Sequence, residues 1–271
     1  MFNPLDYPII FEQPRLTTSL SAWQGHIPFA MFLVQSCRPK TIVELGTHAG
    51  SSYCAFCQAV EHSKNDTECF AIDTWQGDQH TNVNEYGTNV LDTLRKHHDP
   101  LYNSFSNLIQ STFDDALSYF QDGSISLLHI DGLHTYEAVK HDFETWFPKM
   151  QDDGIILFHD ISVYQESFGV HRFWKEVKTD FPHFEFHHCN GLGVLALSAF
   201  SSSPLGDLFH ASQEEAHLLR ALFRGIGNSL LEDEYAKLNG EHIRIVTSRA
   251  WKAISNVKKI LRPGHTPQGL A

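Results

Sequence analysis

The stretch Thr41–Ser52 constrains this chain more than any other, because it predicts a β-strand, a glycine turn and the start of a helix in immediate succession. A short apolar run carrying the acidic Glu44 is followed by Gly46 and, four residues later, by Gly50, ahead of a helical pattern over residues 53–60. In this arrangement the backbone N–H groups at the start of the helix point at a ligand. The stretch therefore predicts an α/β fold with a nucleotide-like ligand seated on the turn.

The chain as a whole has the size and composition of a globular protein. Its 271 residues suffice for one sizeable α/β domain with extensions, and its hydrophobic content of 42% excludes a disordered chain. The net charge of −12 argues against a general nucleic-acid binder, which needs a basic face. No apolar run approaches membrane-spanning length and residues 1–14 lack a signal-peptide pattern, so a cytoplasmic location is expected. The five scattered cysteines are expected to be small core residues, because Cys54 and Cys57 have no second pair to complete a zinc site.

Further apolar runs predict the rest of a sheet and its helices. Strands are expected at residues 69–72, 108–110, 125–130 and 155–158, with a terminal antiparallel hairpin at 184–188 and 194–198. Helices are expected near residues 27–37, 90–98, 113–120, 173–179, 213–223 and 241–260, and one more follows Thr135 and stops near Pro148. The predicted fold is α/β, a Rossmann-like sheet of seven mostly parallel strands with a C-terminal antiparallel hairpin and a helical C-terminal extension. The expected parts are a lead-in with a helix (1–38), a ligand-binding domain (39–200) containing a lid or acceptor loop (74–107), and the extension (201–271).

Polar residues stand at the carboxyl ends of the predicted strands, where open α/β sheets bind their ligands. Asp73 follows the second strand at the distance at which an acidic residue binds ribose hydroxyls, although an ordinary strand-end aspartate is the alternative. Asp131 and His134 follow the fourth strand, and His159 and Asp160 the fifth. Taken singly, Asp131 could cap the following turn, His134 could be an exposed helix-start residue, and Asp160 could be an ordinary strand-end aspartate. Together, at two adjacent strand ends, they are candidates for acid–base or metal chemistry.

Several motifs resemble those of class I S-adenosylmethionine (SAM)-dependent methyltransferases. Glu44-x-Gly46-x-x-x-Gly50 with Asp73 is similar to the first two motifs of that family. The more specific motifs lie at residues 73–78, 129–142, 146–149, 158–160 and 190–193. They resemble the branch that contains macrocin-type and rhamnosyl sugar O-methyltransferases and cephalosporin-hydroxylase-like proteins, a group linked to cell-surface glycan biosynthesis. The resemblance covers about residues 25–198.

This resemblance implies a SAM-dependent O-methyltransferase that acts on a sugar or glycan hydroxyl. The residues that it implies for SAM binding are Glu44, Gly46, Thr47, His48, Gly50, Ser51, Asp73 and Ser111. Asp73 would take the ribose hydroxyls and Ser111 the adenine side. A divalent metal, Mg or Mn, is implied at Asp131, His159 and Asp160, with His134 as the general base and Asp131 also in the catalytic set.

Two positions depart from the family pattern. His48 stands where the first motif commonly has a middle glycine, which is tolerable if only backbone groups meet the ligand there. His159 stands where metal-dependent relatives tend to have a second acid. Because magnesium prefers oxygen ligands, His159 shifts the expected metal towards one that tolerates imidazole, such as manganese.

The tail at residues 241–271 is basic in an otherwise acidic chain. Its cations accompany apolar residues at helical spacing, which is typical of a helix that lies on an anionic membrane or holds a glycolipid. The alternative, which we favour, is a helix packed on its own domain or on a partner subunit. The sequence leaves the oligomeric state open.

Two other functions remain open. A non-catalytic relative would keep the fold as a binding or assembly module, an alternative that His159 keeps open. A nicotinamide-dependent oxidoreductase is disfavoured, because the glycine spacing is not GxGxxG and acids follow the fourth and fifth strands. The expected partner is a small-molecule, glycan or glycolipid acceptor and not a nucleic acid.

Overall fold

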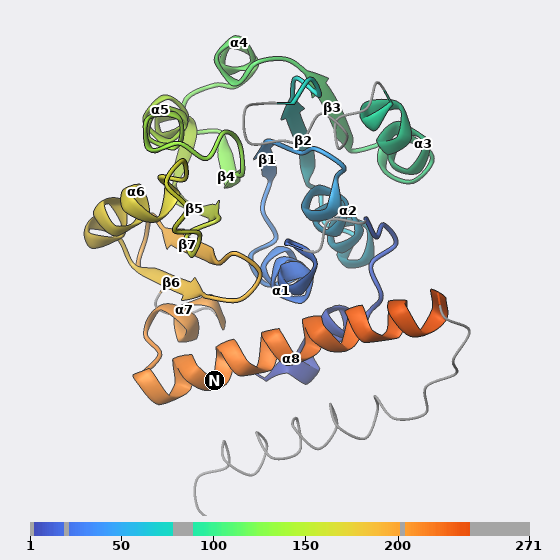
Figure 1. Cartoon of the computed structure of the whole chain (residues 1–271), viewed down its shortest axis with the longest axis vertical. Coiled ribbons are helices and arrows are strands. Elements are labelled where there is room, and N and C mark those ends of the chain that lie inside the picture. Colours follow the sequence, from blue (N-terminus) through green and yellow to red (C-terminus); the bar gives the residue numbers. More distant parts are fainter. Residues whose placement is uncertain (1–2, 19–21, 78–88, 201–203, 239–271) are drawn as a thin grey trace, which may run out of the picture.

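A seven-stranded sheet with the strand order β3-β2-β1-β4-β5-β7-β6 forms the centre of the molecule (Figure 1). The computed structural model describes residues 3–18, 22–77, 89–200 and 204–238. The strands are β1 (Thr41–Leu45), β2 (Glu68–Asp73), β3 (Ser106–Gln110), β4 (Ile125–Ile130), β5 (Met150–His159), β6 (His183–Phe186) and β7 (Leu192–Ala196). Strands β1–β5 pair in parallel, whereas β7 pairs antiparallel with both β5 and β6. The predicted mostly parallel sheet with its terminal hairpin is therefore confirmed.

The register of the central strands brings their carboxyl ends level. Leu45 at the end of β1 lies beside Ile72 of β2 and Ile130 of β4, and Ile130 in turn lies beside Phe158 of β5. The residues that follow these four strands consequently meet at one edge of the sheet, as open α/β sheets require for a ligand site.

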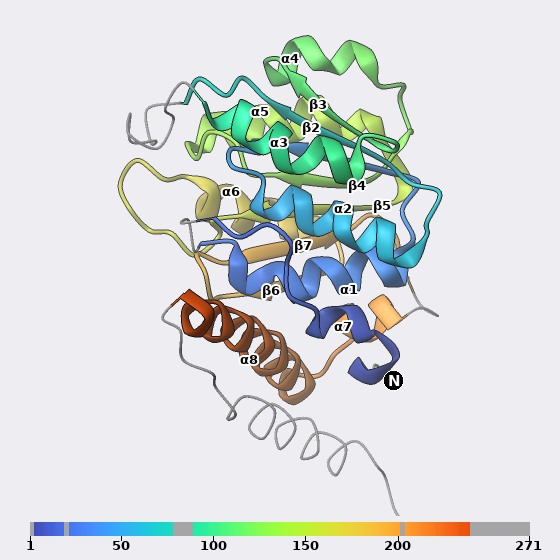
Figure 2. The ribbon, with the colours of Figure 1, turned by 90° about the vertical axis from the view of Figure 1, so that its right-hand side faces the viewer.

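Helices cover both faces of the sheet, which explains why its central strands are apolar on both sides. Helices α1 (Ile27–Cys37), α2 (Ser51–Ser63) and α3 (Val90–Tyr102) lie on one face, and α4 (Phe113–Ala116), α5 (Tyr136–Trp146) and α6 (Val170–Val177) on the other (Figure 2). The two faces enclose separate apolar cores. Phe29, Phe56 and Leu157 belong to the first core, and Trp146, Phe158 and Trp174 to the second.

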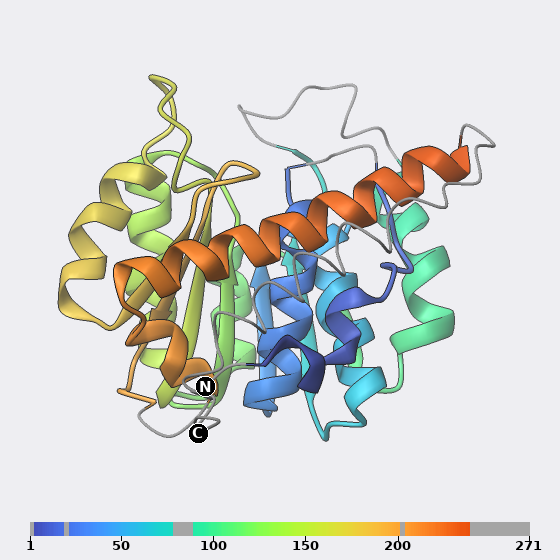
Figure 3. The same cartoon turned by 90° about the horizontal axis from the view of Figure 1, so that it is seen from below.

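Two C-terminal helices, α7 (Pro204–Phe209) and α8 (Gln213–Leu238), extend the first face. Helix α8 runs across α1 and packs on the short 3₁₀ helix Gln24–His26 (Figure 3). The approach is close, because a Cβ on Gly227 would lie 2.5 Å from the carbonyl oxygen of Gly25. The C-terminal extension thus supports the segment that leads into α1. None of the helices in the described ranges is both long and apolar enough to cross a membrane.

Several element bounds differ from the sequence prediction for identifiable reasons. Strand β5 begins at Met150, because its pairing with β4 continues across an irregularity between Ile125 and Leu127. Helix α6 begins directly after Gly169, whose N–H donates to the carbonyl of His134, rather than at residue 173. Helix α8 continues far beyond residue 223, and α7 was not predicted. The predicted helix at 241–260 and residues 78–88 of the predicted lid lie outside the described residues, so the membrane-contact hypothesis and the division into parts stay predictions.

Candidate active site

The turn after β1 is built on backbone conformations that favour glycine. Gly46 has φ +88° and Gly50 has φ +84°. A Cβ on Gly46 would overlap the carbonyl of Asp131, and a Cβ on Gly50 would lie 2.5 Å from Leu94. Between them His48 takes φ +46°, a left-handed conformation that glycine adopts more readily. The turn delivers the chain into α2 with that helix's first N–H groups at the edge of the sheet.

Asp73 fixes the shape of this turn. Its Oδ2 accepts a hydrogen bond from the His48 N–H (2.8 Å) and its Oδ1 accepts one from the Trp75 N–H (2.7 Å). The Trp75 indole in turn donates to the carbonyl of His48 (2.8 Å). Burial raises the pKa of Asp73, and the hydrogen bonds from His48 and Trp75 oppose the rise. A carboxylate has about four acceptor positions, so part of this capacity remains for ligand hydroxyls.

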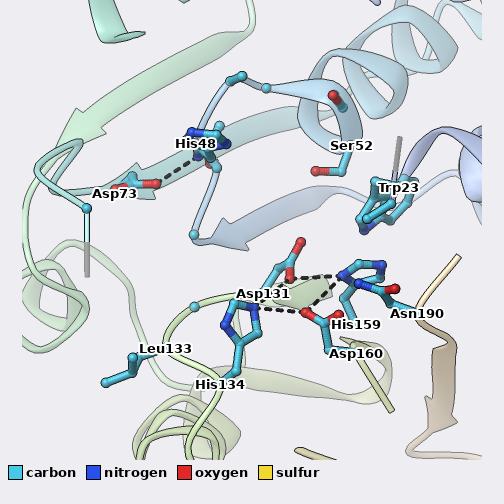
Figure 4. A pocket seen from close by; sticks show the side chains of 18 of the residues that line it. Trp23, His48, Ser52, Asp73, Asp131, Leu133, His134, His159, Asp160 and Asn190 are labelled. Atoms are coloured by element: carbon cyan, nitrogen blue, oxygen red, sulfur yellow. Dashed lines mark hydrogen bonds and ion pairs between the residues drawn. The ribbon is translucent and has the colours of Figure 1, made fainter. Parts of the chain in front are cut away.

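A cavity of about 620 Å³ opens at this edge of the sheet, within the range of small-molecule sites (Figure 4). Most of the predicted site residues line it: Gly46, Thr47, His48, Gly50, Ser51, Asp73, Asp131, His134, His159 and Asp160. Glu44 and Ser111 do not. The backbone N–H of Ser111 donates to the carbonyl of Asp73, while its neighbours Thr112 and Phe113 line the cavity. The structure therefore gathers the two predicted groups of residues, the glycine turn and the later strand ends, around one space.

Two aspartates and two histidines form a compact cluster at the ends of β4 and β5. His134 Nε2 lies 2.8 Å from Asp160 Oδ2 and 3.8 Å from Asp131 Oδ1. His159 Nδ1 lies 3.2 Å from Asp131 Oδ1 and 3.3 Å from Asp160 Oδ2. Each histidine thus contacts both carboxylates, and the ring of His134 also stacks on Phe168 at 4.8 Å. The cluster faces the cavity (Figure 4).

The cluster holds both histidines protonated at neutral pH. Burial opposes the charge of His134, but hydrogen bonds with Asp131 and Asp160 prevail and raise its pKa to about 10. Burial likewise opposes the charge of His159, and the two carboxylates outweigh it and hold its pKa well above the usual range. Burial raises the pKa of both aspartates, whereas the charge of His159 and the hydrogen bonds from the two histidines lower it by more, so both stay ionised.

The donor atoms of this cluster fit a divalent cation. One ligand atom each from Asp131, His134 and Asp160 lie within 4.8 Å of one another, and Asp160 Oδ1 is buried without a hydrogen-bond partner among the described residues. Two carboxylates and an imidazole suit manganese, and magnesium if waters complete its shell. His159 turns its Nδ1 towards the two acids, while its Nε2 donates to the carbonyl of Cys189 (3.1 Å) and so fixes the orientation of the ring. Its predicted role as a metal ligand stays a prediction.

Glu44 is fully buried behind the cavity in a hydrogen-bonded chain. Its Oε2 lies 2.8 Å from Nδ1 of His129, and Nε2 of His129 accepts from the indole N–H of Trp23 (3.2 Å). Because an indole nitrogen can only donate, the His129 proton lies on Nδ1, facing Glu44. Glu44 does not line the cavity itself. Through His129 it holds the indole of Trp23, which does.

Sequence reasoning did not single out Trp23, Thr112, Phe113, Phe168 or Asn190, which also line the cavity. Thr112 could have been found from its place directly before the acidic start of α4, where it is the N-cap. Asn190 belongs to a motif that was noted without a role. Trp23 and Phe168 carry no local signal, because their positions depend on contacts with distant residues.

Asp142 on α5 provides a stability prediction beside the site. Burial raises its pKa to about 7, against the influence of His141, and its Oδ2 lies 3.3 Å from where a Cβ on Gly132 would stand. A folded-state pKa above the unfolded value means that the group destabilises the fold as pH rises from about 4 towards 7 and beyond. Asp142→Asn should therefore raise the free energy of unfolding at pH 8 by about 1–3 kcal/mol, and less at pH 5.

Urea denaturation at the two pH values, with the exposed Asp152→Asn as the matched control, measures this effect. An equal gain at both pH values, or a loss at pH 8, would show that the carboxylate of Asp142 is not the destabilising group.

Comparison with known proteins agrees with this geometry. A family model described as "Methyltransferase domain" matches residues 43–161, which contain the glycine turn, Asp73 and the cluster. A protein of Sinorhizobium fredii (strain NBRC 101917 / NGR234) described as "Uncharacterized protein y4gI" is 46% identical over 184 residues. That match covers 68% of this chain and 20% of the relative, so the chain spans about one fifth of the relative's length.

Solved structures share the fold at low sequence identity. The chain is similar to a candidate caffeoyl-CoA O-methyltransferase from Staphylococcus aureus, with a TM-score of 0.50 at 12% identity, covering 71% of this chain and 90% of that one. It also matches the O-methyltransferase TomG of tomaymycin synthesis from Streptomyces achromogenes, solved in complex with SAM, with a TM-score of 0.49 at 12% identity, covering 72% and 96%. Residues 43–161 thus match a methyltransferase domain, and the chain has the fold of solved O-methyltransferase structures.

Proposed function

We propose that this chain is a SAM-dependent O-methyltransferase that acts on a sugar or glycan hydroxyl. One observation supports the proposal above all: two different groups of residues line the same cavity. A glycine turn with a buried carboxylate, Asp73, forms one side, and a carboxylate–histidine cluster at Asp131, His134 and Asp160 forms the other. The first suits a nucleoside and the second suits activation of a hydroxyl group.

The donor would bind along the glycine turn. The backbone of the turn from Gly46 to Ser51, which lines the cavity, would face its methionine part, and the remaining acceptor capacity of Asp73 would take its ribose hydroxyls. Thr112 and Phe113 would line the adenine side in place of Ser111, because they reach the cavity and Ser111 does not.

The cluster would hold and deprotonate the acceptor. Asp131 and Asp160 would hold a divalent cation, Mg or Mn, beside His134, and this cation when bound lowers the pKa of a hydroxyl group next to it. His134 as general base needs its neutral imidazole, which the two aspartates disfavour unless a cation offsets their charge. His159 would keep the two carboxylates apart and oriented, since its Nδ1 lies within 3.3 Å of both.

The test is transfer of tritium from [methyl-³H]SAM to cell-surface glycans of a strain that lacks the gene, with and without a chelator. We expect labelled glycan with the wild-type protein and about a 100-fold loss in the presence of EDTA, restored by Mn²⁺. Label without any effect of EDTA would contradict the cation. Binding of SAM without label in any glycan fraction would favour the non-catalytic module.

A further inference from the structure

We propose that Trp23 and Asn190 form the acceptor subsite and that this subsite selects an uncharged ring that carries hydroxyl groups. The proposal rests on the proposed function, because it assumes that the donor lies at Asp73. It assigns two residues far apart in the sequence to one task, the choice of the acceptor.

Both residues lie beside the cluster, on the side of the cavity away from Asp73 (Figure 4). The ring of Trp23 lies 6.2 Å from the ring of His159, and Nε2 of His159 donates to the carbonyl of Cys189, directly before Asn190. His159 thus lies between the two proposed walls. A molecule held by both would place a hydroxyl near Asp131 and Asp160.

Trp23 is a rigid wall, because buried groups fix its ring. Only 5% of the residue is exposed, its N–H donates to His129, and His129 is held by Glu44. Phe56 packs against the indole at 5.8 Å. A fixed indole face offers apolar contact to the C–H groups of a ring.

Asn190 stands on a strained turn that is held from two sides. Cys189, Asn190 and Gly191 have φ values of +49°, +66° and +88°, three left-handed residues in succession between β6 and β7. The carbonyl of Cys189 accepts hydrogen bonds from Nε2 of His159 and Nε2 of His26 (3.2 Å), and the carbonyl of Asn190 accepts from the N–H of Ser162 (2.8 Å).

His26 completes the support of this turn. It is fully buried, burial lowers its pKa well below the usual value, and it is therefore neutral with its proton on Nε2. Left-handed residues other than glycine are strained and persist where the surroundings over-determine them. The turn holds the side chain of Asn190 exposed at the cavity, where its carboxamide can both donate and accept hydrogen bonds.

The charges around the cavity indicate which acceptors fit. No lysine or arginine is found among the described residues that line it. The loop 161–169, which contributes Phe168 to the cavity, also contains none. The two imidazolium rings of the cluster already pair with its two carboxylates, so no cationic side chain among the described lining residues is left to pair with a phosphate or carboxylate group on the acceptor. A nucleotide-linked or thioester-linked acceptor is therefore disfavoured, and an uncharged ring is favoured.

The experiment is saturation-transfer NMR on the full chain with saturating S-adenosylhomocysteine (SAH). The probes are a panel of methyl pyranosides, each paired with the 1-phosphate of the same sugar. We expect transfer to at least one methyl pyranoside, and at least tenfold weaker binding of its 1-phosphate. Trp23→Leu and Asn190→Gly should each weaken the pyranoside by at least tenfold, about 1.4 kcal/mol, with SAH affinity unchanged.

Three controls make the result specific. Asn190→Gly keeps the left-handed turn and removes only the carboxamide, Trp23→Phe keeps an aromatic face, and Asn103→Ala changes an exposed asparagine at the end of α3. We expect Trp23→Phe to retain more binding than Trp23→Leu, and Asn103→Ala to change nothing.

Each contrary outcome has its own meaning. Absence of SAH binding to the wild type would overturn the proposed function together with this subsite. SAH binding with no transfer to any pyranoside, equal binding of the 1-phosphates, or unchanged pyranoside binding in both variants would overturn the subsite alone. A loss of SAH affinity in Trp23→Leu would place the indole on the donor and overturn its assignment to the acceptor.

Discussion

Asp160→Asn should abolish binding of Mn²⁺ and lower methyl transfer by about 100-fold or more, while SAH still binds. Asp160 accepts from His134 at 2.8 Å and contacts His159 at 3.3 Å, so the amide leaves two imidazolium rings with one carboxylate between them. Asparagine keeps the shape of the side chain and tolerates the φ of +61° found at this position. The loss is therefore one of charge and not of fold.

Titration of Mn²⁺ by calorimetry, followed by the transfer assay, measures both effects. Asp66→Asn is the matched control, because Asp66 is an exposed aspartate that pairs with Lys40 far from the cluster. A variant of Asp160 that binds Mn²⁺ like the wild type, or transfers methyl groups within threefold of it, would remove the cluster from the mechanism.

Gly46→Ala should destabilise the chain by about 3 kcal/mol or more and eliminate SAH binding. Two independent penalties add at this position. The backbone takes φ +88°, which alanine adopts poorly, and the new Cβ would overlap the carbonyl of Asp131. Since this carbonyl follows β4 and is backbone, relief requires β1 and β4 to separate at the cavity.

Gly123→Ala separates the two penalties. Gly123 also has a positive φ, +68°, but a Cβ there would meet nothing within 4 Å. Gly123→Ala should lower the free energy of unfolding by about 1 kcal/mol, because only the left-handed conformation is unfavourable there. Urea denaturation of both variants gives the steric part by difference. Equal costs for the two would contradict the close approach of the turn to β4.

The sequence predicts the sheet well because its signals are local. Each buried parallel strand is an apolar run with its own boundaries, as at Ile125–Ile130, and the acids that follow the strands meet at one edge by the register alone. The positions of Gly46, Asp73, Asp131 and Asp160 at one cavity follow from this rule.

The finer roles depend on contacts that no local pattern contains. Glu44 looks like part of the turn, yet it pairs with His129, 85 residues later. Ser111 was expected at the ligand, but the chain direction after β3 presents Thr112 instead. The orientation of His159 depends on the carbonyl of Cys189, which engages its Nε2 and leaves Nδ1 facing the two aspartates. Such pairings become visible only once the chain is folded.

The central claim is that the glycine turn and Asp73 bind the methyl donor. Calorimetric titration of the wild-type protein with SAH tests it most directly, with Asp73→Ala as the comparison. We predict one site in the wild type and at least about a tenfold loss of affinity in the variant, as expected when a carboxylate that accepts ligand hydroxyls is removed. No binding of SAH to the wild type, or equal binding to Asp73→Ala, would contradict the account.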